Sequence, residues 1–152
     1  MNAMSIKTQI EKDLNDAMRA RDERRKRTLR MALSAIKLAE VEKGASLEDA
    51  AVLTILQKEI KNQREVITDA EQAGRPELVA EAEAEIAILE HYLPRQLTVQ
   101  EIEAMARAAI QEVGATSPKE MSQVMKTLMP RLQGSADGSQ VSQIVRGLLE
   151  QT

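Results

Sequence analysis

Cysteine, tryptophan and phenylalanine are absent from this chain of 152 residues, and Tyr92 and His91 are its single tyrosine and single histidine. Without cysteine there are no disulfides, no thiolate metal sites and no cysteine nucleophile, and one histidine cannot build a multi-histidine metal site. Since aromatic side chains are almost missing, the core must be built from Leu, Ile, Val, Ala and eight Met. Such a composition is typical of a helical protein.

Long hydrophobic runs are also missing. No stretch has the roughly 18 to 20 uncharged apolar residues that a membrane span needs. The first residues lack the apolar block of a secretory signal. We therefore expect a cytoplasmic protein that makes no contact with a membrane, with a length that suits one or two small domains.

Recognisable catalytic motifs are lacking as well. The sequence contains no P-loop, no dinucleotide-binding fingerprint and no serine elbow. The carboxylates between Glu81 and Glu90 are typical of a solvated helix face, since a diiron bundle would need a second histidine. His91 has no nucleophile beside it in sequence, so we interpret it as a helix C-terminal cap or a packing residue. We expect no catalytic residue, no metal and no cofactor, and hence a protein that is not an enzyme.

The formal net charge of -3 is unevenly distributed. Residues 1–43 carry 11 basic and 7 acidic side chains, residues 44–97 carry 5 and 11, and residues 98–152 carry 5 and 6. Because the middle of the chain is the acidic part, we expect polyanions to bind at the two ends.

Apolar side chains recur at three- and four-residue steps, and no run alternates as a strand would. Prolines, glycines and capping residues divide this pattern into seven predicted helices, which cover 5–20, 22–43, 46–74, 76–89, 98–114, 117–132 and a last segment that begins at 137. Pro94, followed by the polar Arg95 and Gln96, is the best candidate boundary. The sequence thus predicts an all-α protein with a four-helix part over residues 1–94 and a three-helix domain over residues 95–152.

Local signals predict the helix ends. The helix starts are assigned to side chains that can cap backbone N–H groups, which are Ser5, Asp22, Ser46 with Asp49, Thr98 with Glu101, Ser117 with Glu120, and Asp137. The helix stops are assigned to Gly44, Gly74, Gly114 and Gly134. Pro130 is expected to kink the sixth helix or to close it early.

The stretch MPRLQGSADGSQVSQIV, residues 129–145, has two interpretations. In the structural one, Gly134 ends a helix and Asp137 caps the next. In the functional one, backbone N–H groups at the start of the last helix meet an RNA phosphate. The Asp137 carboxylate opposes the second interpretation, because it would already occupy that place.

Seven basic residues lie between Arg19 and Arg30. If the second helix begins after Asp22, its apolar residues face inward, and the outward side carries what we call the basic stripe: Lys26, Arg27, Arg30 and Lys37. The stripe can contact phosphates, or it can be an ordinary solvated face. No aromatic residue is interleaved with it, so no base-stacking platform is expected.

In the sixth predicted helix, apolar residues from Met121 to Leu132 share one side. They are either core or a groove for a partner. The opposite side carries Lys119 and Lys126.

Three segments carry a family resemblance: TLRMALSAIKLAEVEKG, AGRPELVAEAEAEIAILEHYLPRQLTVQEIE and VGATSPKEMSQVMKTLMPRLQGSADGSQVSQIVRGLL. They resemble the bacterial YqeY-like family over nearly the whole chain from about Met4. That family is similar to the tail domain of the B subunit (GatB) of aspartyl/glutamyl-tRNA amidotransferase, and a similar module is appended to some bacterial glutaminyl-tRNA synthetases.

The resemblance implies an all-helical, two-part protein with a tRNA-binding role, and no DNA binding is expected. The family is associated with carbon–nitrogen ligase activity with glutamine as amido-N-donor, but the catalytic domains of the amidotransferase lie outside the region of resemblance. We therefore expect a non-catalytic accessory protein. The alternative is an adaptor that docks on a tRNA synthetase or an amidotransferase subunit.

The residues that we expect to bind RNA are the basic stripe, Lys26, Arg27, Arg30 and Lys37, together with Lys119, Lys126, Arg131 and Arg146. Arg30 and Lys37 match the family pattern. Gln123, Gln133 and Ser135 stand where the family usually has basic residues, and only Lys126 is gained. Each lost phosphate contact lowers affinity and salt dependence, so weak tRNA binding is expected.

Overall fold

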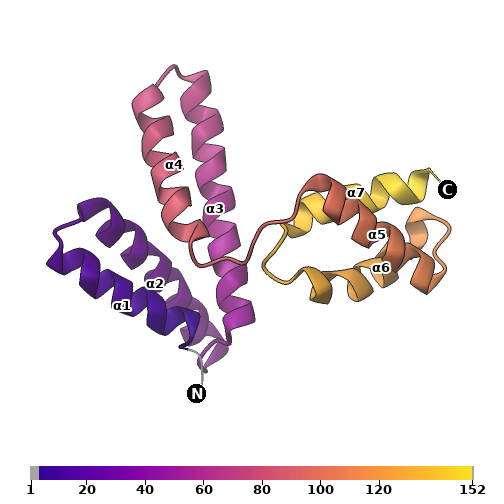
Figure 1. Ribbon diagram of the computed structural model, residues 1–152, viewed down its shortest axis with the longest axis horizontal. Helices are drawn as coiled ribbons and strands as arrows, with labels where there is room; N and C mark the ends of the chain where they lie inside the picture. The colour runs from indigo at the N-terminus through magenta and orange to yellow at the C-terminus, as the bar shows by residue number, and fades with distance from the viewer. Residues whose placement is uncertain (1–3, 152) are drawn as a thin grey trace. The chain divides into compact units, whose positions relative to one another are not determined.

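The computed structural model describes residues 4–151, and in these residues every regular element is a helix. The expectation of an all-helical fold is confirmed for this part of the chain. No helix within it combines the length and the apolar character that crossing a membrane requires. The helices are α1 (Ile6–Arg19), α2 (Glu23–Lys43), α3 (Asp49–Gln72), α4 (Pro76–Glu90), α5 (Val99–Val113), α6 (Met121–Leu128) and α7 (Gly138–Glu150), with 3₁₀ turns η1 (Pro118–Glu120) and η2 (Met129–Leu132) (Figure 1).

The chain divides into two compact units between Leu93 and Pro94, each with a hydrophobic core of its own. Helices α1 to α4 form the first unit, and α5 to α7 with the two 3₁₀ turns form the second.

The first unit consists of two antiparallel helix pairs, α1 with α2 and α3 with α4 (Figure 1). Its core contains fully buried aliphatic side chains from all four helices, among them Ile10, Leu29, Ile36, Leu56 and Leu89. One face of α2 supplies the largest share of this core, because its apolar residues recur every three or four positions.

Carboxylates from one element bind backbone or side-chain groups of another within this unit. Asp49 Oδ1 accepts a hydrogen bond from the Ile6 N–H at 3.0 Å, so the first residue of α3 caps the start of α1. Glu40 accepts from Lys7 Nζ at 2.8 Å and from the Leu47 N–H at 3.1 Å, and both bonds hold its pKa below the ordinary value. These contacts tie α1, α2 and the α2–α3 loop together.

The second unit packs α5, α6 and α7 around Ile102, Leu128, Leu132, Val145 and other apolar side chains. As expected from Pro130, the α-helical hydrogen bonding of α6 ends early, and residues 129–132 continue as the 3₁₀ turn η2. The segment before α5 is fixed to the 133–137 loop. The Leu97 N–H donates to the Ser135 carbonyl at 2.9 Å, and Gln96 Nε2 donates to the Gly134 carbonyl at 2.8 Å.

Several predicted helix ends are confirmed. Ser5 and Asp22 accept hydrogen bonds from the Thr8 and Arg25 N–H groups, and Thr98 forms the complete capping box with Glu101. The four glycines expected to stop helices all have left-handed backbones, as at Gly134 with φ of 75°. A residue with a Cβ pays a steric cost in that conformation, which is why glycine marks these ends.

Other predicted caps are wrong. Ser46 does not start α3, because the helix begins at Asp49 and that carboxylate is bound to α1 instead. Ser117 makes no capping bond either. The Glu120 N–H already donates to the Ser117 carbonyl within the tight turn η1, and the Glu120 carboxylate accepts from the Thr116 N–H at 2.6 Å.

Asp137 stands at the N-cap position of α7, but its side chain accepts no capping bond there, contrary to the prediction. The carboxylate therefore does not cap the backbone N–H groups at the start of α7, which the functional interpretation of this loop assigns to an RNA phosphate.

Replacing Thr28 by Val should stabilise the first unit. Thr28 lies on α2 with no exposed surface, and its hydroxyl has no hydrogen-bond partner among residues 4–151. Valine keeps the shape and removes the unsatisfied hydroxyl, so the free energy of unfolding should rise by about 1 kcal/mol. Urea denaturation followed by the fluorescence of Tyr92, the single tyrosine, measures this unit. The control is Thr54→Val on α3. Thr54 is exposed and its hydroxyl donates to the Ala50 carbonyl, so this variant should not raise the free energy of unfolding.

In an acid titration, Glu101 should show a pKa far below the usual range of a glutamate. Arg95 binds both carboxylate oxygens, at 3.0 and 2.7 Å, and with the Thr98 N–H this holds the pKa of Glu101 at about 2. Because the folded pKa lies below the unfolded one, the stabilisation is present above about pH 4.5 and is lost as pH falls toward about 2. Carboxyl carbon NMR should show the pKa of Glu101 rising in Arg95→Gln, and an unchanged titration would contradict this.

Candidate nucleic-acid interface

The packing of α2 sets the direction of the basic stripe. Leu29, Ala32 and Ile36 have no exposed surface. Residues on the opposite side of the helix must therefore point to solvent. Arg27, Arg30 and Lys37 are exposed as expected, whereas Lys26 is half-buried.

The four stripe residues differ in their partners. Lys26 lies 3.7 Å from Glu23, and Arg27 lies 3.6 Å from Glu85 of α4. In contrast, the structure over residues 4–151 places no carboxylate within 4.0 Å of Arg30 or Lys37. Arg30 Nη2 instead approaches the sulfur of Met18 at 3.6 Å. The stripe thus contains two cations in ion pairs and two outside them, although the charge of Lys37 still helps to lower the pKa of Glu40.

The turn between α1 and α2 adds cations that the sequence analysis did not select. Arg19, Arg21 and Arg24 are exposed around this turn, and none forms an ion pair within the described chain. Arg21 has a left-handed backbone with φ of 56°, which is uncommon for a residue with a side chain. A helical wheel could not reveal this group, because two of the three residues lie at or beyond the helix ends. We call Arg19, Arg21 and Arg24 the basic corner.

The candidate residues of the second unit lie on separate elements. Lys119, Lys126 and Arg146 are exposed on η1, α6 and α7. Arg131 is bound to Glu112 of α5 through two hydrogen bonds, at 3.1 and 2.6 Å, which hold the pKa of Glu112 below its ordinary value. A phosphate would have to displace this carboxylate, so Arg131 is the weakest of the candidates in this unit.

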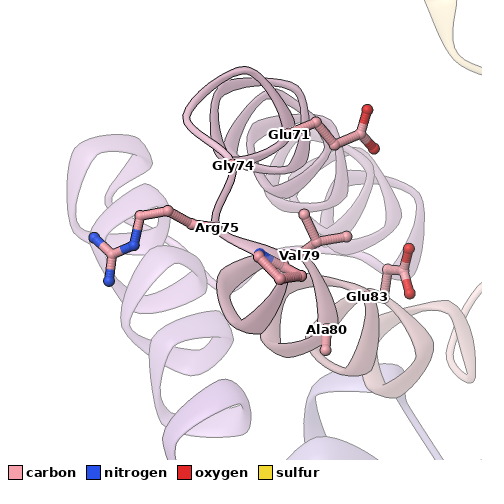
Figure 2. A pocket seen from close by; sticks show the side chains of 7 residues that line it. Glu71, Gly74, Arg75, Val79, Ala80 and Glu83 are labelled. Carbon is pink, nitrogen blue, oxygen red and sulfur yellow. The ribbon is translucent and has the colours of Figure 1, made fainter.

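One cavity of about 440 Å³ lies beside the α3–α4 turn (Figure 2). The side chain of Val79 lines it together with the acidic Glu71 and Glu83, and the guanidinium of Arg75 is bound to Glu77 at 2.9 Å. A site with this charge is unsuited to a polyanion. No group of three His, Cys, Asp or Glu side chains within residues 4–151 is arranged to hold a metal ion.

Two further cavities differ in chemistry. One of about 390 Å³ lies between α5 and α7, with Arg107 and Leu148 in its lining. A smaller one of about 210 Å³ is lined by Arg25, Ile88, His91 and Tyr92. His91, which we expected to be a cap or a packing residue, occupies the C-cap position of α4.

Large apolar side chains are exposed on the outer face of α2. We call Met31, Leu38 and Val41, with 37%, 61% and 78% of their surface exposed, the apolar strip. Their spacing of seven and three residues places them along one side of the helix, close to Arg30 and Lys37. A run of this kind on one helix is more than scattered surface hydrophobicity.

Comparison with known proteins shows which family this is. The family model described as "Yqey-like protein" matches residues 7–149, nearly all of the chain. A Lachancea thermotolerans protein named "Altered inheritance of mitochondria protein 41, mitochondrial" is 34% identical over 101 residues, 66% of this chain and 54% of its own length. The Eremothecium gossypii protein of the same name is 29% identical over 123 residues, 76% and 67% of the two chains. An uncharacterized Schizosaccharomyces pombe protein is 31% identical over 90 residues, 59% and 73%.

The chain spans about half the length of the first of these relatives. The expectation of a cytoplasmic protein is contradicted, because the Lachancea and Eremothecium relatives are named as mitochondrial proteins. The expectation rested on the absence of a long apolar run, and this absence does not distinguish the cytoplasm from the mitochondrion.

Proposed function

This chain belongs to the YqeY-like family, and we propose that it is a non-catalytic tRNA-binding accessory protein. The proposal has two supports. One is the likeness of this family to the tail domain of the amidotransferase B subunit. The other is the pair of exposed cations on α2, Arg30 and Lys37, that have no carboxylate within 4.0 Å in the described chain. The two units correspond, in this proposal, to a four-helix domain that binds RNA and a three-helix domain that adds weaker contacts.

Arg30 and Lys37 carry the proposal. They are seven residues apart on α2, which separates them by about 10 Å along the helix axis. Both are exposed, and neither has a carboxylate within 4.0 Å in the described chain. Cations that are not committed to internal partners can release counterions from a nucleic acid without first breaking an ion pair.

The basic corner extends this surface. Arg19 ends α1, Arg21 lies in the turn, and Arg24 is in the first turn of α2, which also carries Arg30. Contacts to phosphates require exposed cations on long side chains and do not require a shaped pocket. The backbone of an RNA duplex or loop can therefore lie along these residues.

Binding of this kind is weak, and its salt dependence is limited to the few cations that reach a phosphate. Lys26, Arg27 and Arg131 have carboxylate neighbours at 3.7, 3.6 and 2.6 Å, so each must exchange one partner for another to bind a phosphate. We further propose that the isolated chain performs no amidotransferase reaction. The family association with that activity comes from proteins whose catalytic domains lie outside the region of likeness.

Replacing both Arg30 and Lys37 by Gln should weaken binding of bulk tRNA and lower the slope of log K against log salt by about two units. Filter binding at low and moderate salt measures both quantities. Arg75→Gln, which removes one cation at the α3–α4 turn that is already bound to Glu77, is the matched control and should change neither. Binding no tighter than that of an unrelated acidic protein would sink the proposal, as would equal losses in the two variants.

A second candidate function is favoured by the apolar strip. Leu38 and Val41 are exposed on α2 between charged residues. A phosphate makes no favourable contact with such aliphatic side chains. Burying such groups against a protein contributes about 25 cal/mol for each Å² removed from water. With Lys37 and Arg30 beside it, the strip suits an acidic amphipathic helix. The chain would then be an adaptor on a tRNA synthetase or amidotransferase subunit.

Leu38→Asp should weaken a complex with the purified amidotransferase B subunit by tenfold or more, since it places a carboxylate in the centre of the strip. Val66→Asp, on an exposed apolar residue of α3 outside the strip, is the control that should leave the complex intact. Isothermal titration with nuclease-treated proteins measures the affinity. A complex that disappears on nuclease treatment, or that tolerates Leu38→Asp, speaks against the adaptor.

A further inference from the structure

The only tyrosine and the only histidine of the chain line one cavity with an arginine of α2. This cavity, of about 210 Å³, is formed by Arg25, Ile88, His91 and Tyr92. Its arginine lies directly before Lys26 and Arg27 in the same helix turn. The fold thus brings the two ring side chains from the end of α4 to the basic part of α2.

A hydrogen bond and partial burial hold the Tyr92 ring in place. The Tyr92 hydroxyl donates to Asp13 Oδ2 of α1 at 2.6 Å, and burial of the phenol raises the pKa of Tyr92, so it remains a neutral donor. The His91 ring meets it edge to face, with centroids 5.3 Å apart and planes at 80°. Ile88, one turn earlier on α4, adds an aliphatic wall. The Tyr92 ring is preorganised, because it loses little side-chain freedom when a flat ligand packs on it.

One cation, Arg25, lines the cavity, where it can meet an anion. No carboxylate lines it, and no carboxylate of residues 4–151 lies within 4.0 Å of the Arg25 guanidinium. The Asp13 carboxylate accepts a hydrogen bond from the Tyr92 hydroxyl and keeps its negative charge there, so Arg25 has to outweigh it at the cavity. The Arg25 backbone is fixed as well, since its N–H donates to the Asp22 side chain at 3.2 Å. In contrast, the cavity at the α3–α4 turn is lined by two glutamates and has no aromatic ring.

We propose that this cavity binds one unpaired nucleotide of the RNA that α2 contacts, with a phosphate on Arg25 and the base against the rings of Tyr92 and His91. The inference rests on the proposed tRNA-binding function and names a site for it. An arginine beside ring side chains is the chemistry by which proteins hold single-stranded nucleic acid. The cavity is smaller than the roughly 300 to 1,000 Å³ of drug-sized ligand sites, in keeping with a single base. A base inside a duplex cannot enter, because its two faces are stacked.

The composition of the chain makes the test direct. Since tyrosine and histidine each occur once, their ring signals in a proton NMR spectrum belong to Tyr92 and His91 without further assignment. We expect saturable ring-current shifts of both signals on titration with a short single-stranded RNA and with uridine monophosphate. A duplex of the same length and inorganic phosphate alone should leave the Tyr92 signals in place.

Variants separate the contacts. Arg25→Gln should weaken binding of the single strand at least about fivefold, the scale of one stacked or phosphate-bound nucleotide. Tyr92→Leu removes the ring face, so it should weaken binding of the single strand by a similar factor, provided that circular dichroism shows it folded. Arg75→Gln has the same change in charge outside the cavity and should have no effect.

The outcomes distinguish this inference from the proposed function. If RNA binds in filter assays while the Tyr92 and His91 signals do not move, the cavity is not the site and the tRNA-binding proposal stands. Equal shifts with duplex, or with phosphate alone, would likewise overturn the nucleotide site. If neither RNA nor uridine monophosphate binds, both proposals are wrong.

Discussion

Burial of one face of α2 is the constraint on which the first unit depends. Leu29, Ala32 and Ile36 lose all of their exposed surface against the neighbouring helices, and at about 25 cal/mol for each Å² of apolar surface this term outweighs any single polar contact in the unit. The helix cannot rotate about its axis without exposing them. Everything on the opposite face follows from this, including the outward direction of Arg30 and Lys37 and the exposure of Leu38 and Val41.

The same packing decides which cations form ion pairs. Glu40 lies one helical turn after Lys37 and would be its natural partner. However, its two oxygens accept from Lys7 and from the Leu47 N–H, so it holds α1 and the α2–α3 loop instead. Asp49 and Asp13 are likewise engaged, by the Ile6 N–H and the Tyr92 hydroxyl. Carboxylates that close helix ends and join helices are unavailable to the basic surface, which leaves part of it open to a polyanion.

Local chemistry explains which helix ends were predictable. The Thr98 and Glu101 capping box and the glycine stops involve partners within four residues, so their residue types suffice to identify them. The predicted caps at Ser46 and Ser117 are not formed, because in each case one of the expected capping groups is bound to another partner. For Asp49 that partner is the start of α1, 43 residues away, and for the Glu120 N–H it is the Ser117 carbonyl of a tighter turn. The expected compartment is wrong for another reason, since no property of a folded helical domain encodes it.

The sequence by itself determined the helical fold, the helix boundaries to within a few residues and the inward and outward faces of α2, because these follow from the spacing of apolar residues along one segment. Only the tertiary structure decided which charges are neutralised, as Arg27 is by Glu85 and Arg131 by Glu112, and that Tyr92 and His91 meet Arg25. The Tyr92 and Asp13 pair shows the reason. Residues 79 positions apart become neighbours when helices pack, and the periodicity of a single helix holds no record of which side chain of another helix lies against it.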